Sequence, residues 1–404
     1  MLHVRMYMVA LFGFVCAAMF SQPLPLAGLS EACVVTLHIP DSLEPDARMD
    51  MYVGTKGQKP AEGFPVYLYL HGSGPRDTEW HTGLRLARLF RDAPCMYLIP
   101  RIPNEGEWYR WWQKGKQWAW RHILRQVLSM KEVDPSRIYI FGISEGGYGS
   151  QRLASFYADY LAAAGPMAGG EPLRNAPVEN LGNIGFSLLT GAEDRMFFRN
   201  MLTHHAQVRL DSIAKVYPGE YRHRVGLIAE KGHSIDYSAT TPWLSQFRRK
   251  AHPRHFVWEN MEMDGWKRNA FYNLQVLQEA DTCRTQYEYT LTPAGEENTV
   301  TLVRIDVCHV KYQVSWTDPY WHIPMLFERE LTPARHGKVR LFLTPEIKDA
   351  AKPVDIVVNG RICLSLDKIK GNRQVICGRK ARSLAADLFS DPMRRFDSYV
   401  DIEW

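Results

Sequence analysis

The sequence predicts an α/β protein in which a doubly wound, mostly parallel sheet precedes a β-rich, sandwich-like module. Short apolar runs alternate with helical patterns over residues 32–250. The runs are continuous, as in strands that are buried on both faces of a parallel sheet. After residue 250 the pattern changes to an alternation of apolar and polar residues, which is typical of antiparallel strands. We therefore expect a catalytic domain at 32–250 and a C-terminal β-rich module at 251–404.

The elements of the first domain follow one another in a regular order. Strands are predicted at 66–70, 96–100, 137–141, 161–164, 184–189 and 224–228, and helices at 117–133, after Gly146, at 196–216 and at 242–250. This alternation indicates right-handed crossovers between parallel strands. In the module, strands are predicted at 286–291, 299–307, 310–315, 338–343 and 354–364, with Asn359-Gly360 as a hairpin turn.

Residues 1–21 have the pattern of a secretory signal peptide. Arg5 precedes the apolar run Met6–Phe20, and Ser21-Gln22-Pro23 ends it. The run is shorter than the roughly 20 residues that span a bilayer. We therefore expect an exported chain, periplasmic or extracellular, with no membrane span in its mature form. An uncleaved N-terminal anchor is the alternative.

Charge and cysteine content narrow the class of protein. The formal net charge of +5, from 49 basic and 44 acidic residues, is too small to favour a nucleic-acid partner. Cleavage of the signal peptide would remove Cys16. The other cysteines could form disulfides in an exported chain or remain buried thiols, and both readings stay open. They are Cys33, Cys95, Cys283, Cys308, Cys363 and Cys377.

The segment Gly142-Ile143-Ser144-Glu145-Gly146 lies between a predicted strand and a predicted helix. A serine on such a tight turn is held in a strained backbone conformation, with its hydroxyl exposed above the sheet. The flanking glycines let neighbouring backbone approach closely. Ser144 is therefore the predicted nucleophile.

A serine hydroxyl needs a histidine base, which a carboxylate orients. In this topology the acid and then the histidine come from loops after later strands. Asp194 follows the strand at 184–189, and His233 follows the strand at 224–228. Asp194 could instead cap the next helix. The rival acids are Glu193 and Asp236, and the rival histidines are His204, His205 and His223.

The oxyanion that forms in acyl transfer needs backbone N–H donors. One is expected from Glu145, the residue after the nucleophile. The second is expected from the loop after the strand at 66–70, where His71-Gly72-Ser73-Gly74 stands. We assign this second donor to Ser73, with Gly74 as the rival. The alternative is that the motif is an ordinary glycine-rich turn with no role in catalysis.

Together these features resemble the α/β-hydrolase superfamily. Leu70-His71-Gly72-Ser73-Gly74 and the later Gly-x-Ser-x-Gly-Gly-x-Gly are similar to secreted polyhydroxybutyrate-depolymerase-like and feruloyl-esterase-like serine esterases, with prolyl-oligopeptidase-type peptidases close by. The resemblance covers roughly residues 35–250 and implies the α/β-hydrolase fold and a serine esterase. The chain departs from this branch at Glu145, where a methionine often follows the serine, which leaves substrate choice open.

A cluster of tryptophans precedes the nucleophile strand. Trp108, Trp111 and Trp112 are candidate substrate-binding residues, because aromatic faces stack on sugar rings and phenolic acids. Core packing is an equal alternative for these three. Core packing is favoured for Trp118 and Trp120, which begin a predicted helix.

The sequence therefore predicts a secreted serine hydrolase that cleaves carboxylic esters through an acyl-enzyme. Candidate substrates are small-molecule or polysaccharide-linked esters, including carbohydrate-linked and aromatic acyl esters. A prolyl-oligopeptidase-type serine peptidase is one alternative, although that group usually carries a large N-terminal domain. A non-catalytic binding protein on a hydrolase scaffold is the other, although binding does not require an intact triad. We expect no cofactor and no metal.

Overall fold

The computed structural model describes residues 27–103, 110–280, 284–295, 299–350, 352–366, 391–394, 396 and 398–404. The predicted signal peptide at 1–21 lies outside these residues. Within the described part of the chain, no helix is long and apolar enough to cross a membrane.

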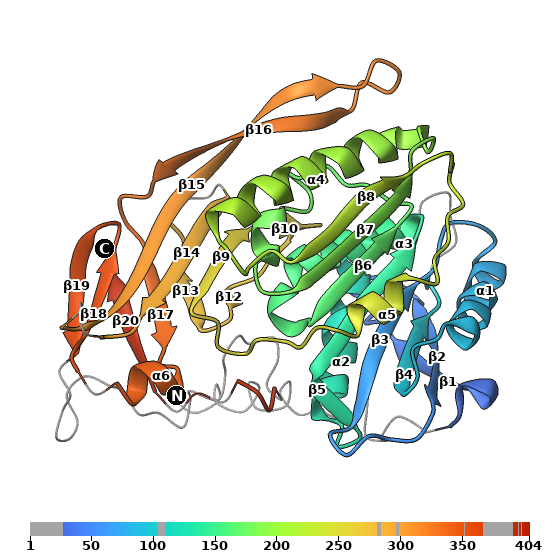
Figure 1. The fold of residues 1–404 in the computed structure, drawn as a ribbon, viewed down its shortest axis with the longest axis horizontal. Coiled ribbons are helices and arrows are strands. Elements are labelled where there is room, and N and C mark those ends of the chain that lie inside the picture. The colour runs from blue at the N-terminus through green and yellow to red at the C-terminus, as the bar shows by residue number, and fades with distance from the viewer. Residues whose placement is uncertain are drawn as a thin grey trace, which may run out of the picture.

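An eight-stranded sheet forms the centre of the first domain, with the strand order β1-β2-β4-β3-β5-β6-β7-β8 (Figure 1). The first two strands pair antiparallel with each other, and β2 pairs antiparallel with β4. All later neighbours are parallel. The strands are β1 Cys33–His38, β2 Arg48–Lys56, β3 Phe64–Leu70, β4 Cys95–Pro100, β5 Val133–Ile143, β6 Ala163–Met167, β7 Gly185–Gly191 and β8 His223–Ile228. This order is that of the α/β-hydrolase fold, so the predicted fold class is confirmed.

Helices cover both faces of this sheet. On one face, Trp80 of α1 and Leu244 of α5 pack against the buried rings of Tyr67 and Tyr97. The other face is covered by α2, α3 and α4, whose apolar residues share a second core cluster with the strands. The helices are α1 Arg76–Leu89, α2 Lys114–Ser129, α3 Glu145–Phe156, α4 Arg199–Val216 and α5 Thr240–Leu244. All parallel strands therefore point their carboxyl ends to one edge, where ligand sites form in such sheets.

Three predicted helices differ from the observed ones. The helix predicted at 117–133 is α2, Lys114–Ser129, and Val133 already begins β5. The closing helix predicted at 242–250 is the five-residue α5, Thr240–Leu244, and Phe247 beyond it packs as irregular chain against the sheet. The helix predicted at 196–216 begins only at Arg199. Before it lies the short 3-10 turn η5, Met196–Phe198, in which Phe197 has a left-handed φ of 55°.

The C-terminal module consists mainly of two packed sheets. A six-stranded sheet has the order β19-β18-β15-β14-β9 with β16 paired to β15, and a four-stranded sheet has the order β12-β13-β17-β20. Aromatic rings fill the space between them, including the stacked pairs Trp258–Phe271 and Phe256–Tyr289. The elements are β9 His255–Asn260, β10 Glu262–Met263, β11 Trp266–Lys267, β12 Ala270–Phe271, β13 Leu274–Gln278, β14 Thr285–Thr292, β15 Thr301–Thr317, β16 Pro324–Pro333, β17 Lys338–Phe342, α6 Pro345–Lys348, β18 Val354–Val358, β19 Arg361–Leu366 and β20 Tyr399–Glu403.

The two strands predicted at 299–307 and 310–315 are one long strand, β15, Thr301–Thr317. The hairpin turn at Asn359-Gly360 is observed, and both residues have a positive φ, 46° and 78°. Beyond the sandwich, the outer half of β15 continues with β16 as an antiparallel ribbon that reaches over α4 (Figure 1). We call this ribbon the arm, and residues 318–323, which connect its two strands, its tip.

The two parts of the chain share buried contacts. Asp159, between β5 and β6, accepts hydrogen bonds from Arg268 at 2.6 and 3.0 Å and from Arg394 at 2.7 Å. All three side chains are almost fully buried. Burial opposes the charge on Asp159, but the two guanidinium groups hold the pKa of this carboxyl below its usual value. Removing one partner would strand a buried charge, so this cluster ties the module to the hydrolase sheet.

Four cysteines lie among the described residues. Cys33, Cys95, Cys308 and Cys363 are free thiols. Cys95 is buried, and burial raises the pKa of its thiol well above the ordinary value. Cys283 and Cys377 lie outside the described residues.

Candidate active site

Ser144 occupies the sharp turn between β5 and α3. Its backbone has φ 59° and ψ −116°, a conformation that is strained for any residue with a side chain. The turn presses against β3: a Cβ on Gly142 would lie 2.3 Å from the Gly146 carbonyl oxygen, and a Cβ on Gly146 would lie 2.0 Å from that of Leu70. No side chain fits at either position. The two glycines therefore allow the strained turn that carries Ser144.

The structure brings Ser144, His233 and Asp194 together at the carboxyl edge of the sheet. His233 follows β8, and its Nε2 lies 3.0 Å from the Ser144 Oγ. Its Nδ1 lies 2.7 Å from the Oδ2 of Asp194, which follows β7. The Asp194 carboxylate is buried, whereas the His233 side chain is 44% exposed. The imidazole is therefore open to solvent, while the carboxylate behind it is shielded.

The rival residues lie elsewhere. Glu193 is exposed and pairs with Arg195 at 2.9 Å. Asp236 accepts hydrogen bonds from the backbone and hydroxyl of Ser238. Among the histidines, His223 contacts Asp211, and His204 and His205 lie on α4. Asp194 is also not the N-cap residue of either following helix, because Arg195 stands at that position before η5 and Phe198 before α4.

Sequence reasoning missed Arg199, which holds the other oxygen of the acid. Its Nη1 donates to the Asp194 Oδ1 at 3.0 Å, and both side chains are buried. The backbone N–H of Asn200 also donates to the Asp194 carbonyl. The sequence does not distinguish this arginine from a surface residue, because many surface arginines also stand at the start of a helix. It fixes the carboxylate so that Oδ2 remains free for His233.

The loop after β3 lies against Ser144. A Cβ placed on Gly72 would be 3.4 Å from the Cβ of Ser144. His71 supports this loop: its Nδ1 donates to the Gly72 carbonyl at 2.8 Å, and its Nε2 accepts the N–H of Ile102 at 3.1 Å. Burial lowers the pKa of His71 to about 4, so the ring is neutral at pH 7. Because C=O and N–H point in opposite directions across a trans peptide, this bond turns the Ser73 N–H away from His71.

Glu145 begins α3 directly after Ser144, and its carboxyl is buried. The Oε1 accepts the backbone N–H of Arg110 at 3.1 Å. Burial raises the pKa of Glu145 above its usual value, although the Arg110 hydrogen bond opposes this.

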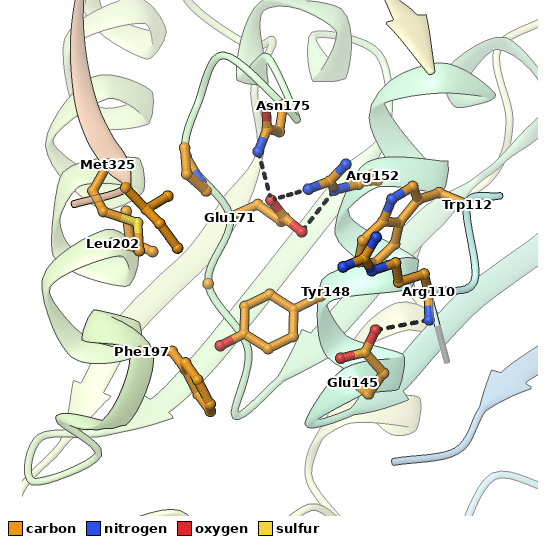
Figure 2. A pocket seen from close by; sticks show the side chains of 13 residues that line it. Arg110, Trp112, Glu145, Tyr148, Arg152, Glu171, Asn175, Phe197, Leu202 and Met325 are labelled. Atoms are coloured by element: carbon orange, nitrogen blue, oxygen red, sulfur yellow. Dashed lines mark hydrogen bonds and ion pairs between the residues drawn. The ribbon is translucent and has the colours of Figure 1, made fainter. Parts of the chain in front are cut away.

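A cavity of about 220 Å³ opens next to this residue. Its apolar walls are formed by Trp112, Tyr148, Phe197, Leu202, Ile323 and Met325. At the polar end, Glu171 accepts two hydrogen bonds from Arg152, at 2.7 and 3.0 Å, and one from Asn175 (Figure 2). These charges neutralise each other. The space therefore suits a mainly apolar group.

The three tryptophans that are candidate substrate-binding residues differ in where the structure places them. Trp108 lies outside the described residues. Of the two roles open to Trp111, the structure supports packing: the side chain is fully buried, and its Nε1 donates to the His71 carbonyl. It therefore supports the loop behind the site and does not contact the cavity. Trp112 lines the cavity, and the Arg152 guanidinium stacks on its ring at 3.9 Å. Trp120 is buried in the core, as predicted.

No protein-family model matches the chain. Over 146 residues it is 29% identical to NocK of Nocardia uniformis subsp. tsuyamanensis, whose name marks it as an inferred esterase, a match covering 33% of this chain and 41% of that protein. It is 34% identical over 74 residues to poly(3-hydroxyalkanoate) depolymerase C of Paucimonas lemoignei, covering 17% of this chain and 18% of the relative. The chain thus matches less than half the length of either curated relative.

Solved structures were also compared with the chain. A thermostable esterase has a TM-score of 0.41 at 20% identity, covering 55% of this chain and 64% of its own. A ferulic acid esterase from Anaeromyces mucronatus has a TM-score of 0.40 at 13% identity, covering 53% and 90%. The assignment of the fold rests on the strand order of the sheet and on the geometry of the site. This chain has the α/β-hydrolase fold, as the resemblance implied, and it is similar to esterases of that superfamily.

Proposed function

We propose that the protein is a serine hydrolase that cleaves carboxylic esters through an acyl-enzyme. The observation that carries the proposal is the continuous hydrogen-bond chain from Ser144 through His233 to Asp194, on a strained turn at the carboxyl edge of the sheet. A binding protein has no need of this alignment. The names of the partial relatives, one an esterase and the other a poly(3-hydroxyalkanoate) depolymerase, support the same chemistry.

In the first half-reaction, the Ser144 oxygen attacks the ester carbonyl carbon while His233 Nε2 takes the hydroxyl proton. Asp194 keeps the proton of the neutral imidazole on Nδ1 and stabilises the imidazolium that forms. The C–O bond to the alcohol then breaks, and the alcohol leaves with the proton from Nε2. Water repeats the sequence on the acyl-enzyme, releases the carboxylic acid and restores Ser144.

The negative charge on the carbonyl oxygen needs donors in fixed positions. We assign this role to the backbone N–H groups of Glu145 and Ser73. Glu145 stands at the first position of α3, where N–H groups have no partner within the helix. Ser73 is exposed beside the nucleophile, and the bond from His71 to Gly72 orients the peptide that carries its N–H.

We further propose that the chain is exported and acts on carbohydrate-linked or aromatic acyl esters. Export rests on the N-terminal sequence, where Arg5 is followed by an apolar run. The substrate class rests on the mainly apolar cavity beside Glu145 and on Trp112 in its wall.

The test is a panel of short-chain and aromatic esters and of peptide amides, assayed with wild-type protein and with Ser144→Ala. We expect ester turnover that Ser144→Ala abolishes, and labelling of Ser144 by a fluorophosphonate. Ester turnover that persists in Ser144→Ala would contradict the proposal, and amide turnover exceeding ester turnover would favour the peptidase. Thr36→Ala, on an exposed edge strand, is a matched hydroxyl-deletion control.

A further inference from the structure

The tip of the arm is built to hold one shape. The Asp318 carboxylate accepts three backbone N–H groups, from Tyr320 at 3.0 Å, Trp321 at 2.6 Å and Ile323 at 2.7 Å. These bonds organise the connection between β15 and β16, far from the sandwich to which the arm belongs. The tip thus reaches the hydrolase domain as an ordered element.

Side chains from the tip and from the start of β16 complete the cavity. Ile323 and Met325 form part of its wall, together with Tyr148 of α3 and Leu202 of α4. Figure 2 shows Met325 beside Leu202, across the cavity from the Trp112 side. Glu145, which directly follows the nucleophile, lines the same cavity. The C-terminal module therefore supplies one wall of the cavity that Glu145, the residue after Ser144, also lines.

The arm also contacts the segment between the catalytic acid and α4. Trp321 stacks on Phe197 with ring centroids 5.2 Å apart and an interplanar angle of 23°. Trp316 meets Phe198 edge-on at 5.0 Å. Both phenylalanines have left-handed backbones, with φ 55° and 58°. Two successive non-glycine residues in this region are disfavoured, so surrounding contacts must hold them there.

This segment leads directly to the triad. Arg199 follows Phe198, and its guanidinium lies over the Phe197 ring at 5.0 Å while its Nη1 holds Asp194. A chain of contacts therefore runs from Trp321 through the two phenylalanines to Arg199 and Asp194. The geometry of this chain of contacts depends on the left-handed turn at Phe197 and Phe198, which the arm covers.

We infer that the arm sets the specificity of the site, which rests on the esterase function proposed above. Ile323 and Met325 restrict the cavity so that it admits one compact apolar or aromatic group of the ester, a short chain or a single ring. An apolar cavity of about 150 Å³ binds benzene, so about 220 Å³ has room for one substituted ring. Trp321 acts as a positioning residue for the acid through Phe197.

The size limit is tested with two ester series, p-nitrophenyl esters of lengthening acids and acetates of lengthening alcohols, together with fluorophosphonates of lengthening alkyl chain. Wild-type kcat/KM should fall once the group outgrows the cavity. Ile323→Ala and Met325→Ala should each raise the rate for the larger groups about tenfold relative to acetate. Leu331→Ala, an exposed leucine on the same arm, is the matched control. The series that responds identifies the side of the ester that enters the cavity.

The positioning role is tested by Trp321→Ala and Trp321→Phe. On the shortest ester, where the cavity is not filled, Trp321→Ala should lower kcat about tenfold with little change in KM, and Trp321→Phe should restore most of it, because a ring can still stack on Phe197. An unchanged kcat in Trp321→Ala would overturn this role.

Failure of the inference and failure of the proposed function are distinguishable. If Ser144 of the wild-type protein takes up no fluorophosphonate, the proposed function is wrong. If Ser144 is labelled but Ile323→Ala and Met325→Ala keep the wild-type size profiles in both series, the assignment of specificity to the arm is wrong. Melting temperatures of all variants show whether each is folded.

Discussion

A histidine at the joint between the two parts of the chain should make stability fall at alkaline pH. His255 begins β9, and its Nδ1 lies 2.7 Å from Glu220 and its Nε2 3.4 Å from Glu288. The ring of Tyr217 stacks on it at 4.4 Å, and the Tyr217 hydroxyl donates to Glu288 at 2.8 Å. The imidazolium therefore bridges the loop after α4 and strand β14.

The size of the effect follows from the pKa. Burial alone would lower the pKa of His255, but the hydrogen bonds to Glu220 and Glu288 outweigh it and raise the pKa to about 9. Because the folded pKa lies above the unfolded value of about 6.5, this contribution is fully present below pH 6.5 and is lost as the pH rises through 9. The difference corresponds to about 3 kcal/mol of unfolding free energy. At about 2 cal/mol/K per residue, this lowers the melting temperature by roughly 4 °C.

The assay is the melting temperature of wild-type protein and of His255→Gln at several values between pH 6 and pH 9.5. The wild-type protein should lose stability relative to the variant across this interval, because glutamine does not titrate. His204→Gln, an exposed substitution on α4, is the control for histidine loss. If the wild-type and His255→Gln curves stay parallel between pH 6.5 and 9, the argument for a charged bridge is wrong.

Other substitutions separate the roles of individual side chains. Asp194→Asn should lower kcat roughly 10³- to 10⁴-fold and also lower the melting temperature, because the buried Arg199 loses its counter-charge, whereas Glu193→Gln should leave ester turnover intact; equal losses of turnover in steady-state assays would refute the acid assignment. His71→Ala leaves a buried N–H and a buried carbonyl without partners, so it should cost about 3 kcal/mol in chemical denaturation and lower kcat as well; unchanged kcat would separate this histidine from the oxyanion loop. Asn359→Ala should lower the free energy of unfolding by about 2 kcal/mol. Asn359→Gly should lower it by less, because glycine keeps the positive φ of the turn; a larger loss in Asn359→Gly would argue against the turn as the cause.

Much of the site was predictable because its signals are local. The strained turn at Ser144 needs glycines at fixed offsets, and the parallel topology delivers Asp194 and His233 in a fixed chain order. Each of the three residues follows its own strand, so a pattern read along the chain locates it. The hairpin at Asn359 was predictable for the same reason, since the turn dictates residue type.

The rest depends on contacts between distant segments, for which the sequence carries no local signal. The arm joins residues near 320 to the turn at 197–198, and nothing in Trp321 distinguishes a stacking partner from an ordinary surface residue. Arg199 and Trp111 were missed or left open because burial decides their roles. Periodicity also split β15 into two strands, since its outer half leaves the core and loses the inward alternation of its inner half.

The reach of the arm has a consequence for the order in which the protein becomes competent during synthesis. Ser144, Asp194 and His233 leave the ribosome well before Trp316 and Trp321. At usual elongation rates the delay is on the order of ten seconds. Throughout that interval the left-handed turn at Phe197 and Phe198 lacks the rings that cover it in the finished protein. A nascent chain would therefore carry all three triad residues without a fully supported acid, and its turnover would stay below that of the finished protein until the C-terminal sheets had formed.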